Sequence, residues 1–363
     1  MSQRTAWCLL TVLAAGVPVA GVPAASAQVV RQQTATLDLP RVSPAAAVSQ
    51  RVGLTDVEIT YHRPAVNERT VWGGLVPYGQ VWRTGANENT LISLSSDVTV
   101  EGQPLAAGTY GLHTIPGEEE WTIIFSRDTD AWGSFSYNEE NDALRVTVQP
   151  GEVSFHQERM IFVFDEASNE SAMVSLIWDK LQVPFKIEVD SPQVTLASIR
   201  EQLKGVSQFF WMGPQQAANY CLQEEMNYEE AMGWIDASIQ AEERFENLQT
   251  KAQLLEKTGD ETQSAEIMAK ALDMGNAGQL HNYARSLIGQ DEKEEALTVF
   301  ERNVKQNPDA WFVELGLARG YSALGQFDKA VASMKVSLER APEGQKAYVQ
   351  SLIDRLERKE DIN

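Results

Sequence analysis

"LARGYSALGQFDKAVASMKVSLERAP", residues Leu317–Pro342, is the most informative stretch of this chain for its fold. Its small residues and its closing proline have counterparts one period earlier, because Ala296 lies 34 residues before Ala330 and Pro308 lies 34 residues before Pro342. A constant period of roughly 20–50 residues indicates a repeat array. Small residues let two helices of a hairpin approach, larger residues fill the gap, and proline ends the second helix. The spacing predicts stacked helical hairpins.

This stretch resembles a tetratricopeptide repeat at the positions of its motif, which are Leu317, Ala318, Tyr321, Gly325, Phe327, Ala330 and Pro342. "EKEEALTVFERNVKQNP" is a weaker copy, and "NYEEAMGWIDASIQAEE" and "LLEKTGDETQSAEIMAKAL" are degenerate copies further back. We expect about four units in an all-α solenoid over residues 191–363, closed by "GQKAYVQSLIDRLERKE". The alternative is a generic helical bundle. The resemblance implies a concave groove for a protein or peptide partner.

Before Asp190 the chain has the pattern of β-strands. Short segments of β-branched and aromatic residues alternate with polar ones, and turn sequences such as "EGQPLAAG" and "IPGEEE" separate them. Strands at this spacing without helices between them predict an antiparallel β-sandwich over residues 28–190. The predicted strands are Val57–Thr60, Thr90–Ser95, Val98–Gly102, Glu120–Ser126, Leu144–Gln149, Met160–Asp165, Ala172–Trp178 and Val183–Val189.

The N-terminus has the features of an export signal. Arg4 precedes the apolar run "AWCLLTVLAAGVPVAGVPA", and "ASA" at Ala25–Ala27 fits a cleavage site. We therefore expect a signal peptide over residues 1–27, a mature chain that starts at Gln28, and a soluble periplasmic or secreted product. The alternative is an uncleaved membrane anchor. Cleavage leaves Cys221 as the one cysteine, which has no partner for an intramolecular disulfide.

Composition limits the classes of partner. The 363 residues are 43% hydrophobic, which is typical of globular proteins, and the formal net charge is −21. This acidic balance argues against nucleic acid, whose phosphates need positive charges, and against docking on an anionic membrane. We expect no membrane span after signal cleavage.

Candidate ligand-binding residues gather around "VPYGQVWRTGANENT", residues Val76–Thr90. They are Arg63, Arg69, Trp82, Arg83, Asn87 and Glu88. One interpretation is a pocket in which arginines hold an anionic or polyol ligand, a small polar ligand or glycan, beside Trp82 and Tyr78. The other is a buried network of salt bridges and turns that fixes a long loop to the sandwich. In that network we expect Glu88 or Glu68 to hold Arg83.

This region is similar to a known family. "YHRPAVNERTVWGGLVPYGQVWRTGANENT", "DVTVEGQPLAAGTYGLHTIP", "EWTIIFS" and "WGSFSYNEENDALRV" resemble the secreted bacterial family called domain of unknown function 2911, over about Leu37 to Val189. The resemblance implies an exported β-sandwich that is sometimes joined to tetratricopeptide repeats. It implies no established activity, substrate or catalytic residue.

Other chemistry has weaker support in the sequence. The four histidines show no spacing typical of metal ligands, so we expect no metal site and no cofactor. The acids Glu139, Glu140 and Asp142 fit a solvated hairpin tip better than a glycosidase pair. In "WGSFSY" we favour core packing for the aromatic residues, with sugar stacking as the alternative.

The sequence thus favours an exported, non-enzymatic binding protein. Its β-sandwich is a binding or structural module, and its repeats are a scaffold for a protein partner. The alternative is a cell-envelope hydrolase with a polar arginine, glutamate and histidine site near Arg83, which requires these groups to converge on an open cleft.

Overall fold

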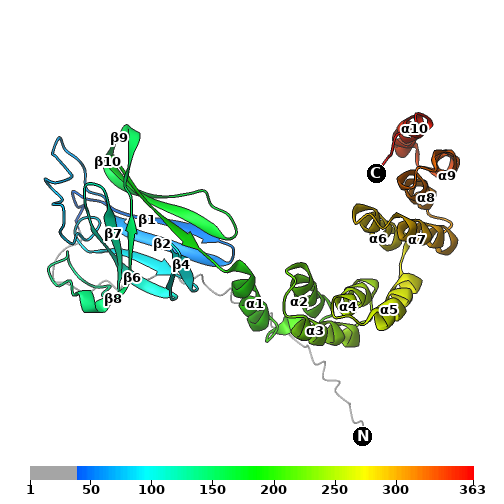
Figure 1. Ribbon diagram of the computed structural model, residues 1–363, viewed down its shortest axis with the longest axis horizontal. Coiled ribbons are helices and arrows are strands. Elements are labelled where there is room, and N and C mark those ends of the chain that lie inside the picture. Colours follow the sequence, from blue (N-terminus) through cyan, green and yellow to red (C-terminus); the bar gives the residue numbers. More distant parts are fainter. Residues whose placement is uncertain (1–38) are drawn as a thin grey trace, which may run out of the picture.

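The computed structural model describes residues 39–363. Its first part has two antiparallel sheets, one with strand order β1-β2-β3-β6-β7-β8 and one with order β5-β4-β10-β9 (Figure 1). The predicted signal peptide, residues 1–27, lies outside the described residues. The strands are β1 Ala45–Val52, β2 Thr55–His62, β3 Thr90–Leu94, β4 Val98–Val100, β5 Gln103–Leu105, β6 Gly108–Ile115, β7 Trp121–Ser126, β8 Asp142–Val148, β9 Gly151–Asp165 and β10 Ser171–Glu188.

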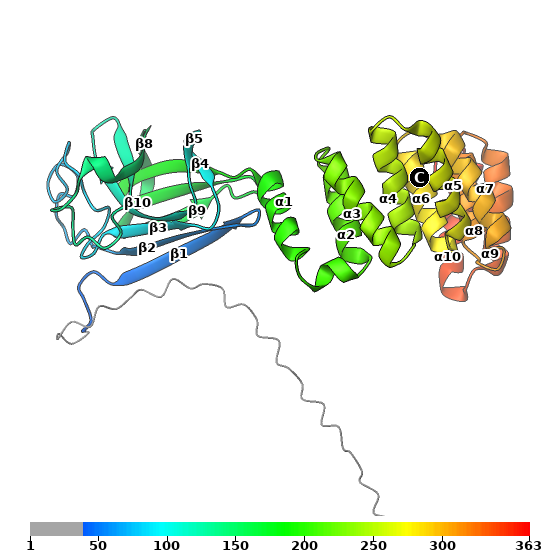
Figure 2. The same ribbon diagram turned by 90° about the horizontal axis from the view of Figure 1, so that it is seen from below.

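The core of the β part lies between the two sheets, which face each other (Figure 2). Alternation along the strands places every second side chain there, as in β2, where Val57 and Ile59 are fully buried and Glu58 is not. Each buried side chain of this size stabilises the fold by about 1.5–3 kcal/mol. The predicted antiparallel β-sandwich is confirmed, although the two sheets do not close into a barrel.

Three details of the strand prediction were wrong. The segments Ala172–Trp178 and Val183–Val189 are one strand, β10, whose register with β9 shifts on both sides of Asp179. These shifts interrupt the alternation, so one bent strand has the sequence pattern of two. β1 and β6 were not predicted, and "EGQPLAAG" contains β5 as well as a turn.

Two residues, Val189 and Asp190, separate the last strand from the first helix. β10 ends at Glu188 and α1, Ser191–Gln202, begins two residues after Val189. The Asp190 side chain accepts a hydrogen bond from the Gln193 backbone at 3.2 Å and caps the helix. α1 then contacts two cores, because Val194 packs against the β core while Leu196 is buried in the first helical cluster.

The second part has four helical hairpins, α2–α3, α4–α5, α6–α7 and α8–α9, followed by α10. The even-numbered helices α2, α4, α6 and α8 line the inner side of a bend. The odd-numbered helices α3, α5, α7 and α9 lie on its outer side (Figure 1). The predicted repeat array and its closing helix are confirmed. The helices are α2 Met212–Gln223, α3 Tyr228–Ala241, α4 Phe245–Lys257, α5 Glu261–Met274, α6 Ala277–Gly289, α7 Lys293–Gln306, α8 Val313–Ala323, α9 Phe327–Arg340 and α10 Glu343–Glu357.

Small residues allow the close packing of these helices. Ala296 on α7 and Ala330 on α9 are fully buried, as the 34-residue spacing predicts. The Phe300 ring of α7 packs on Gly316 and Gly320 of α8, and a Cβ at either glycine would lie only 2.8 Å or 3.0 Å from it. Within residues 39–363, the structure has no helix that combines the length and apolarity needed to cross a membrane.

Candidate functional site

The loop between β2 and β3 is bound to the edge of the sandwich by its own backbone. Trp82 exchanges two hydrogen bonds with Thr114 of β6, at 2.8 and 2.9 Å, and the Gly79 amide donates to the Pro116 carbonyl at 2.8 Å. Further along, the Thr90 amide donates to the Arg83 carbonyl at 3.3 Å. These bonds hold the segment around Trp82 and Arg83 in one place against β6.

Trp82 is part of an aromatic cluster at the end of the core. Its ring stacks on Trp178 of β10 at 5.9 Å and meets Trp72 edge-on at 5.9 Å, and Trp72 also meets Trp121 at 5.0 Å. The Trp82 indole N–H donates to the Gly85 carbonyl at 3.2 Å. The four tryptophans join the loop to both sheets, so Trp82 has a structural role in addition to any contact with a ligand.

Arg63 and Arg69 both donate to backbone carbonyls. Arg63 Nε donates to Met160 at 2.9 Å, and Arg69 donates from Nε to Val66 at 3.0 Å and from a terminal nitrogen to Ala65 at 2.6 Å. The Arg69 guanidinium binds carbonyls of the loop itself, and the Arg63 guanidinium binds a carbonyl of β9. For them the structure favours the interpretation as structural supports over direct ligand contact.

Glu88 is bound by a different arginine than expected. Arg41 donates to both carboxylate oxygens at 2.8 and 2.7 Å, and His62 Nε2 lies 3.6 Å from one of them. Burial raises the pKa of Glu88, but the Arg41 hydrogen bonds and the nearby positive charges outweigh burial, so the pKa is lowered. Asn87, with a positive φ of 59°, donates from its side chain to Ser43 O at 3.3 Å.

Arg83 has no carboxylate partner within residues 39–363, so the expectation that Glu88 or Glu68 holds it was wrong. Its side chain is half-buried, and its buried Nε has no hydrogen-bond partner in the described part of the chain. Burial alone lowers the pKa of the guanidinium. The physical reason for the difference is the position of Arg41, which the sequence places far away but the fold brings to Glu88.

Two exposed aromatic rings flank Gly133, which lies next to Arg83. Trp132 is 62% exposed and Phe135 is 86% exposed, and their rings stack with centroids 6.1 Å apart. Core packing for these two residues was therefore a wrong expectation. The backbone explains their position, because Trp132 forms an isolated bridge with Glu88 and Gly133 has a positive φ of 75° that turns the loop outward.

Beneath this loop lies a polar network that holds its base. Asp142 accepts hydrogen bonds from Tyr137 at 2.6 Å and from Arg145 at 2.5 Å. Burial, together with Asp142, raises the pKa of Tyr137 to about 12. The ring of His113 on β6 packs on Tyr137, and its Nδ1 is 3.1 Å from the Ser134 hydroxyl. Asp142 therefore binds Tyr137 and Arg145. Glu139 and Glu140 are exposed, as expected for a solvated hairpin tip.

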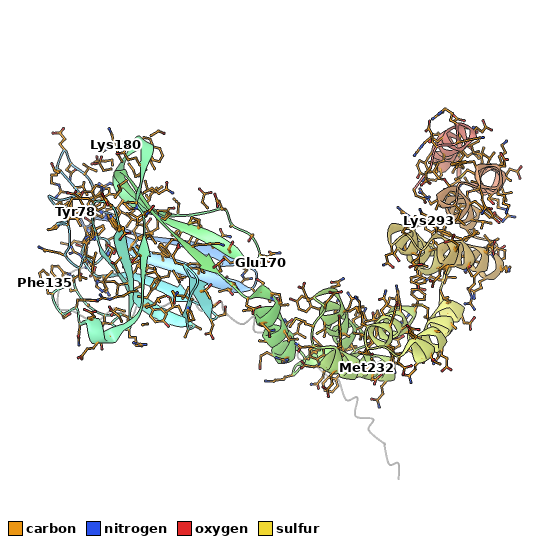
Figure 3. The ribbon with its side chains drawn as sticks, in the orientation of Figure 1. Tyr78, Phe135, Glu170, Lys180, Met232 and Lys293 are labelled. Carbon is orange, nitrogen blue, oxygen red and sulfur yellow. The ribbon has the colours of Figure 1, made fainter. Side chains whose placement is uncertain are left out.

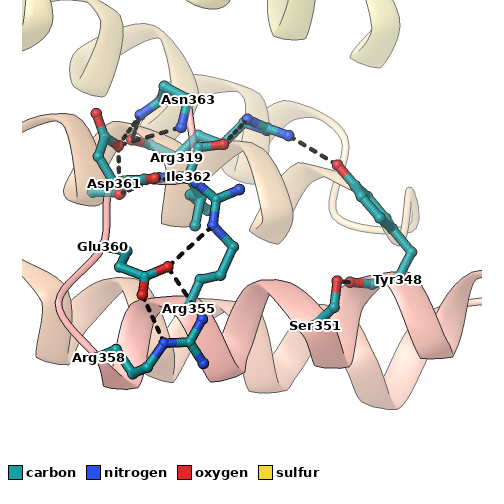
Figure 4. Close-up of polar contacts among 10 residues, drawn as sticks. Arg319, Tyr348, Ser351, Arg355, Arg358, Glu360, Asp361, Ile362 and Asn363 are labelled. Carbon is teal, nitrogen blue, oxygen red and sulfur yellow. Dashed lines mark hydrogen bonds and ion pairs between the residues drawn. The ribbon is translucent and has the colours of Figure 1, made fainter.

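The inner face of the helical part holds a segment of the same chain (Figure 4). Arg319 of α8 donates to the Ile362 carbonyl at 2.6 Å, and Ser322 of α8 donates to the Asp361 carboxylate at 2.7 Å. The Ile362 side chain is 3% exposed and packs in the cluster formed by α8, α9 and α10. Segment 361–363 is therefore bound as an extended peptide is bound, through backbone hydrogen bonds and one buried apolar residue.

Positive charge is concentrated around this segment. Burial lowers the pKa of Arg319, and the charges of Arg285 on α6 and Arg355 on α10 lower it further. His281 of α6 adds no charge near neutral pH, because burial and the two arginines Arg319 and Arg285 lower its pKa to about 4. The sequence predicted a concave groove on the repeats but did not identify these residues, because the repeat motif marks the residues that pack between helices.

The remaining chemical candidates are the free cysteine and possible metal ligands. Cys221 on α2 is a buried free thiol, and burial raises its pKa. No group of three or more histidine, cysteine, aspartate or glutamate side chains that could hold a metal ion occurs in residues 39–363.

Several solved structures are similar to the helical part. YrrB, described as a TPR protein with an unusual peptide-binding site, is 17% identical over 45% of this chain and 84% of its own, with a TM-score of 0.27. The C-terminal part of a TPR repeat-containing protein from Cytophaga hutchinsonii is 12% identical over 46% of this chain and 67% of its own, with a TM-score of 0.31. MamA is 13% identical over 44% of this chain and 92% of its own, with a TM-score of 0.29.

No curated protein matches the chain. The β part does match a family model. The match spans nearly all of both sheets, from just before β1 to the next-to-last residue of β10. Residues 43–187 match the family described as protein of unknown function (DUF2911), which confirms the resemblance of the β part to that family.

Proposed function

We propose that this protein is an exported binding protein whose helical part holds an acidic peptide segment of a protein partner. The partner lies on the inner face formed by α6, α8 and α10. The observation that carries the proposal is the binding of segment 361–363 to Arg319 and Ser322. A surface that holds one extended segment by backbone hydrogen bonds has the chemistry to hold another.

The charge of the face supports an acidic partner. Arg319 and Arg285 lie one repeat apart, because 34 residues separate them, and each affects the pKa of His281. Arg319 is engaged with Ile362 and Tyr348, whereas Arg285 is exposed and is available to a ligand. In a chain of net charge −21, a cluster of arginines on one face selects for carboxylates.

Export is the second element of the proposal. It rests on the pattern of residues 1–27 and on the resemblance of the β part to a secreted family. The hydrolase alternative has less support from the contacts of Arg83, because Glu88 forms its ion pair with Arg41, one nitrogen of which donates to both carboxylate oxygens.

A synthetic peptide with the sequence ERKEDIN, residues 357–363, is the direct probe of the inner face. We expect it to bind a chain that ends at Lys359, measured by calorimetry, and to bind the full chain at least about tenfold more weakly, since a tethered segment competes at roughly millimolar effective concentration. In the shortened chain, Arg319→Gln and Arg285→Gln weaken binding.

The matched control is Arg302→Gln on α7, whose guanidinium pairs with Asp273 at 2.6 Å and which should leave binding unchanged. Circular dichroism confirms that the shortened chain keeps its helices. Absence of binding by a folded shortened chain contradicts the proposed role of this face. If the proposal holds, Arg319→Gln and Arg285→Gln should also abolish capture of a partner from the exported fraction. The peptide should compete with that capture.

A further inference from the structure

We infer that the end of the β part around Arg83, Trp132 and Phe135 is a binding site for a saccharide that carries a carboxylate, such as a hexuronic acid oligomer. This site is separate from the inner face of the helices, and its test is independent of the proposed peptide binding.

Arg83 is a cation prepared for an external anion. The backbone around it is fixed by the bonds of Trp82 and Thr90, so the guanidinium is held in position. Its Nε is buried without a hydrogen-bond partner among residues 39–363, while burial lowers its pKa. The two terminal nitrogens are not buried and have no hydrogen-bond partner in the described residues, so they can donate to a bound carboxylate. Arg63 and Arg69, in the same loop region, both have carbonyl partners.

The net charge of the immediate surroundings also favours an anion. Glu88 is neutralised by Arg41, and burial lowers the pKa of His62, so that its ring is neutral at pH 7. No carboxylate of the described residues is among the causes of the lowered Arg83 pKa, which burial alone explains. The charge of Arg83 is therefore left over locally, on a protein that is otherwise strongly acidic.

The aromatic rings adjoin this charge through Gly133. A Cβ at Gly133 would lie 3.9 Å from the Arg83 terminal nitrogen and 3.0 Å from the Phe135 ring, so both groups meet at this glycine. Trp132 precedes it and pairs with Glu88 through the backbone. Phe135 and Tyr78 lie at the end of the β part that is remote from the helices (Figure 3). Gly133 therefore joins the Arg83 guanidinium to the stacked pair of rings.

The combination selects a particular ligand chemistry. Exposed rings present apolar faces, on which the apolar face of a pyranose packs, and a guanidinium fork binds a carboxylate through two parallel hydrogen bonds. An aromatic acid requires a deep apolar pocket for its ring. Here the rings are largely exposed, so a hydroxylated ring that remains in contact with water fits better. These properties converge on an acidic sugar.

Calorimetric titration of the full chain with trigalacturonate tests the inference. We expect binding that weakens at least about tenfold for the neutral galactose trimer and for Arg83→Gln, since a charge-assisted bidentate contact contributes about 1.4 kcal/mol or more. Arg83→Lys should recover only part of the affinity, because it keeps the charge and loses the fork. Trp132→Ala should weaken binding at least about fivefold.

Two control variants match these changes in chemistry. Phe155→Ala removes a ring that is 51% exposed on β9, and Arg51→Gln removes a surface arginine that is paired with Asp56. Both should bind as the unmodified chain does. The inference is overturned if trigalacturonate does not bind, if Arg83→Gln binds equally well, or if inorganic phosphate binds at Arg83 while Trp132→Ala leaves trigalacturonate binding unchanged. If Arg83→Gln does not fold, the Trp132→Ala and Arg83→Lys results decide.

Discussion

Arg63, Arg69 and Arg83 lie in one loop region but have different surroundings. The difference distinguishes arginines that support the backbone from one that can bind a ligand. Arg69 donates to two carbonyls of the loop, whose residues Ala65 and Val66 are only 7% and 5% exposed. Arg63 supports the Met160 carbonyl of β9. Arg83 supports nothing comparable in the described residues. Identical side chains thus have different roles, because the loop supplies carbonyls to Arg69, β9 supplies one to Arg63, and neither supplies one to Arg83.

Substitution of Arg69 tests this assignment. Arg69→Ala leaves the nearly buried Ala65 carbonyl without its donor and the Val66 carbonyl with only the Arg69 backbone amide, and we expect it to reduce the free energy of unfolding by about 1–3 kcal/mol. Arg83→Ala breaks no side-chain hydrogen bond within residues 39–363, so its unfolding free energy should stay within about 0.5 kcal/mol of the unmodified chain. Urea denaturation of both variants measures the difference. An equal loss for the two variants contradicts the distinction.

At the level of single elements, β6 carries a titratable group in the core. His113 is 1% exposed, and burial lowers its pKa from 6.5 to about 4, although Asp142 and Asp128 act in the opposite direction. The unfolded chain takes up a proton at this histidine below about pH 6.5, whereas the folded chain does so only near pH 4. The stabilising contribution is therefore present above pH 6.5 and is lost as the pH falls toward 4.

Substitution of His113 should reduce this dependence on pH. We expect His113→Phe to lose less stability between pH 7.5 and pH 5 than the unmodified chain, whose loss from this residue over that interval is about 2 kcal/mol. His156→Gln is the control. In the unmodified chain, hydrogen bonds to Glu158 and Asp179 raise the pKa of His156, so the contribution of His156 to stability has the opposite sign and is lost as the pH rises. Urea titrations at the two pH values measure both. Identical pH dependence in His113→Phe and the unmodified chain would falsify this assignment.

At the scale of the whole molecule, α1 belongs to the packing of both parts. Val194 contacts the β core, and Leu196 is fully buried with Ala218, Cys221 and Ile235 in the helical cluster. The sequence indicates a boundary at Asp190, because the period changes there. The packing shows that a β fragment cut at residue 190 loses the apolar side chain that α1 places on its core.

Two fragments test the contribution of α1. Residues 28–190 should fold alone, as the sequence predicts, but residues 28–204 should melt a few degrees higher, since partial burial of the Val194 side chain contributes up to about 1.5 kcal/mol. Val194→Ala in the longer fragment should remove most of the gain. Equal melting temperatures of the two fragments would show that α1 does not stabilise the β part.

Export makes a separate prediction for the whole chain. N-terminal sequencing of the protein from the producing cell should begin at or near Gln28, because the apolar run and "ASA" fit signal cleavage. A change of Ala27 to a large charged residue, Ala27→Arg, should block cleavage and leave the longer form. Recovery of a cytoplasmic protein that still begins at Met1 would rule out the signal.

Local sequence patterns were sufficient for the architecture. Period-two alternation predicts strands such as β2 and β7, and the 34-residue spacing of Ala296 with Ala330 predicts the helical hairpins. These features depend on neighbours within one element or one repeat, so they are written in short windows of sequence. Where the local pattern breaks, as at the register shifts around Asp179 in β10, the prediction failed.

Contacts between distant residues were decided only by the tertiary structure. Arg41 and Glu88 are 47 residues apart, yet their ion pair leaves Arg83 free of Glu88. Trp132 and Phe135 have the composition of core residues, but the turn at Gly133 exposes them beside Arg83. Segment 361–363 meets α8 because the helices bend and α10 returns it to the inner face. The physical reason is common to all three: charge pairing and burial depend on which surfaces the complete fold brings together, and no short window of sequence contains both partners.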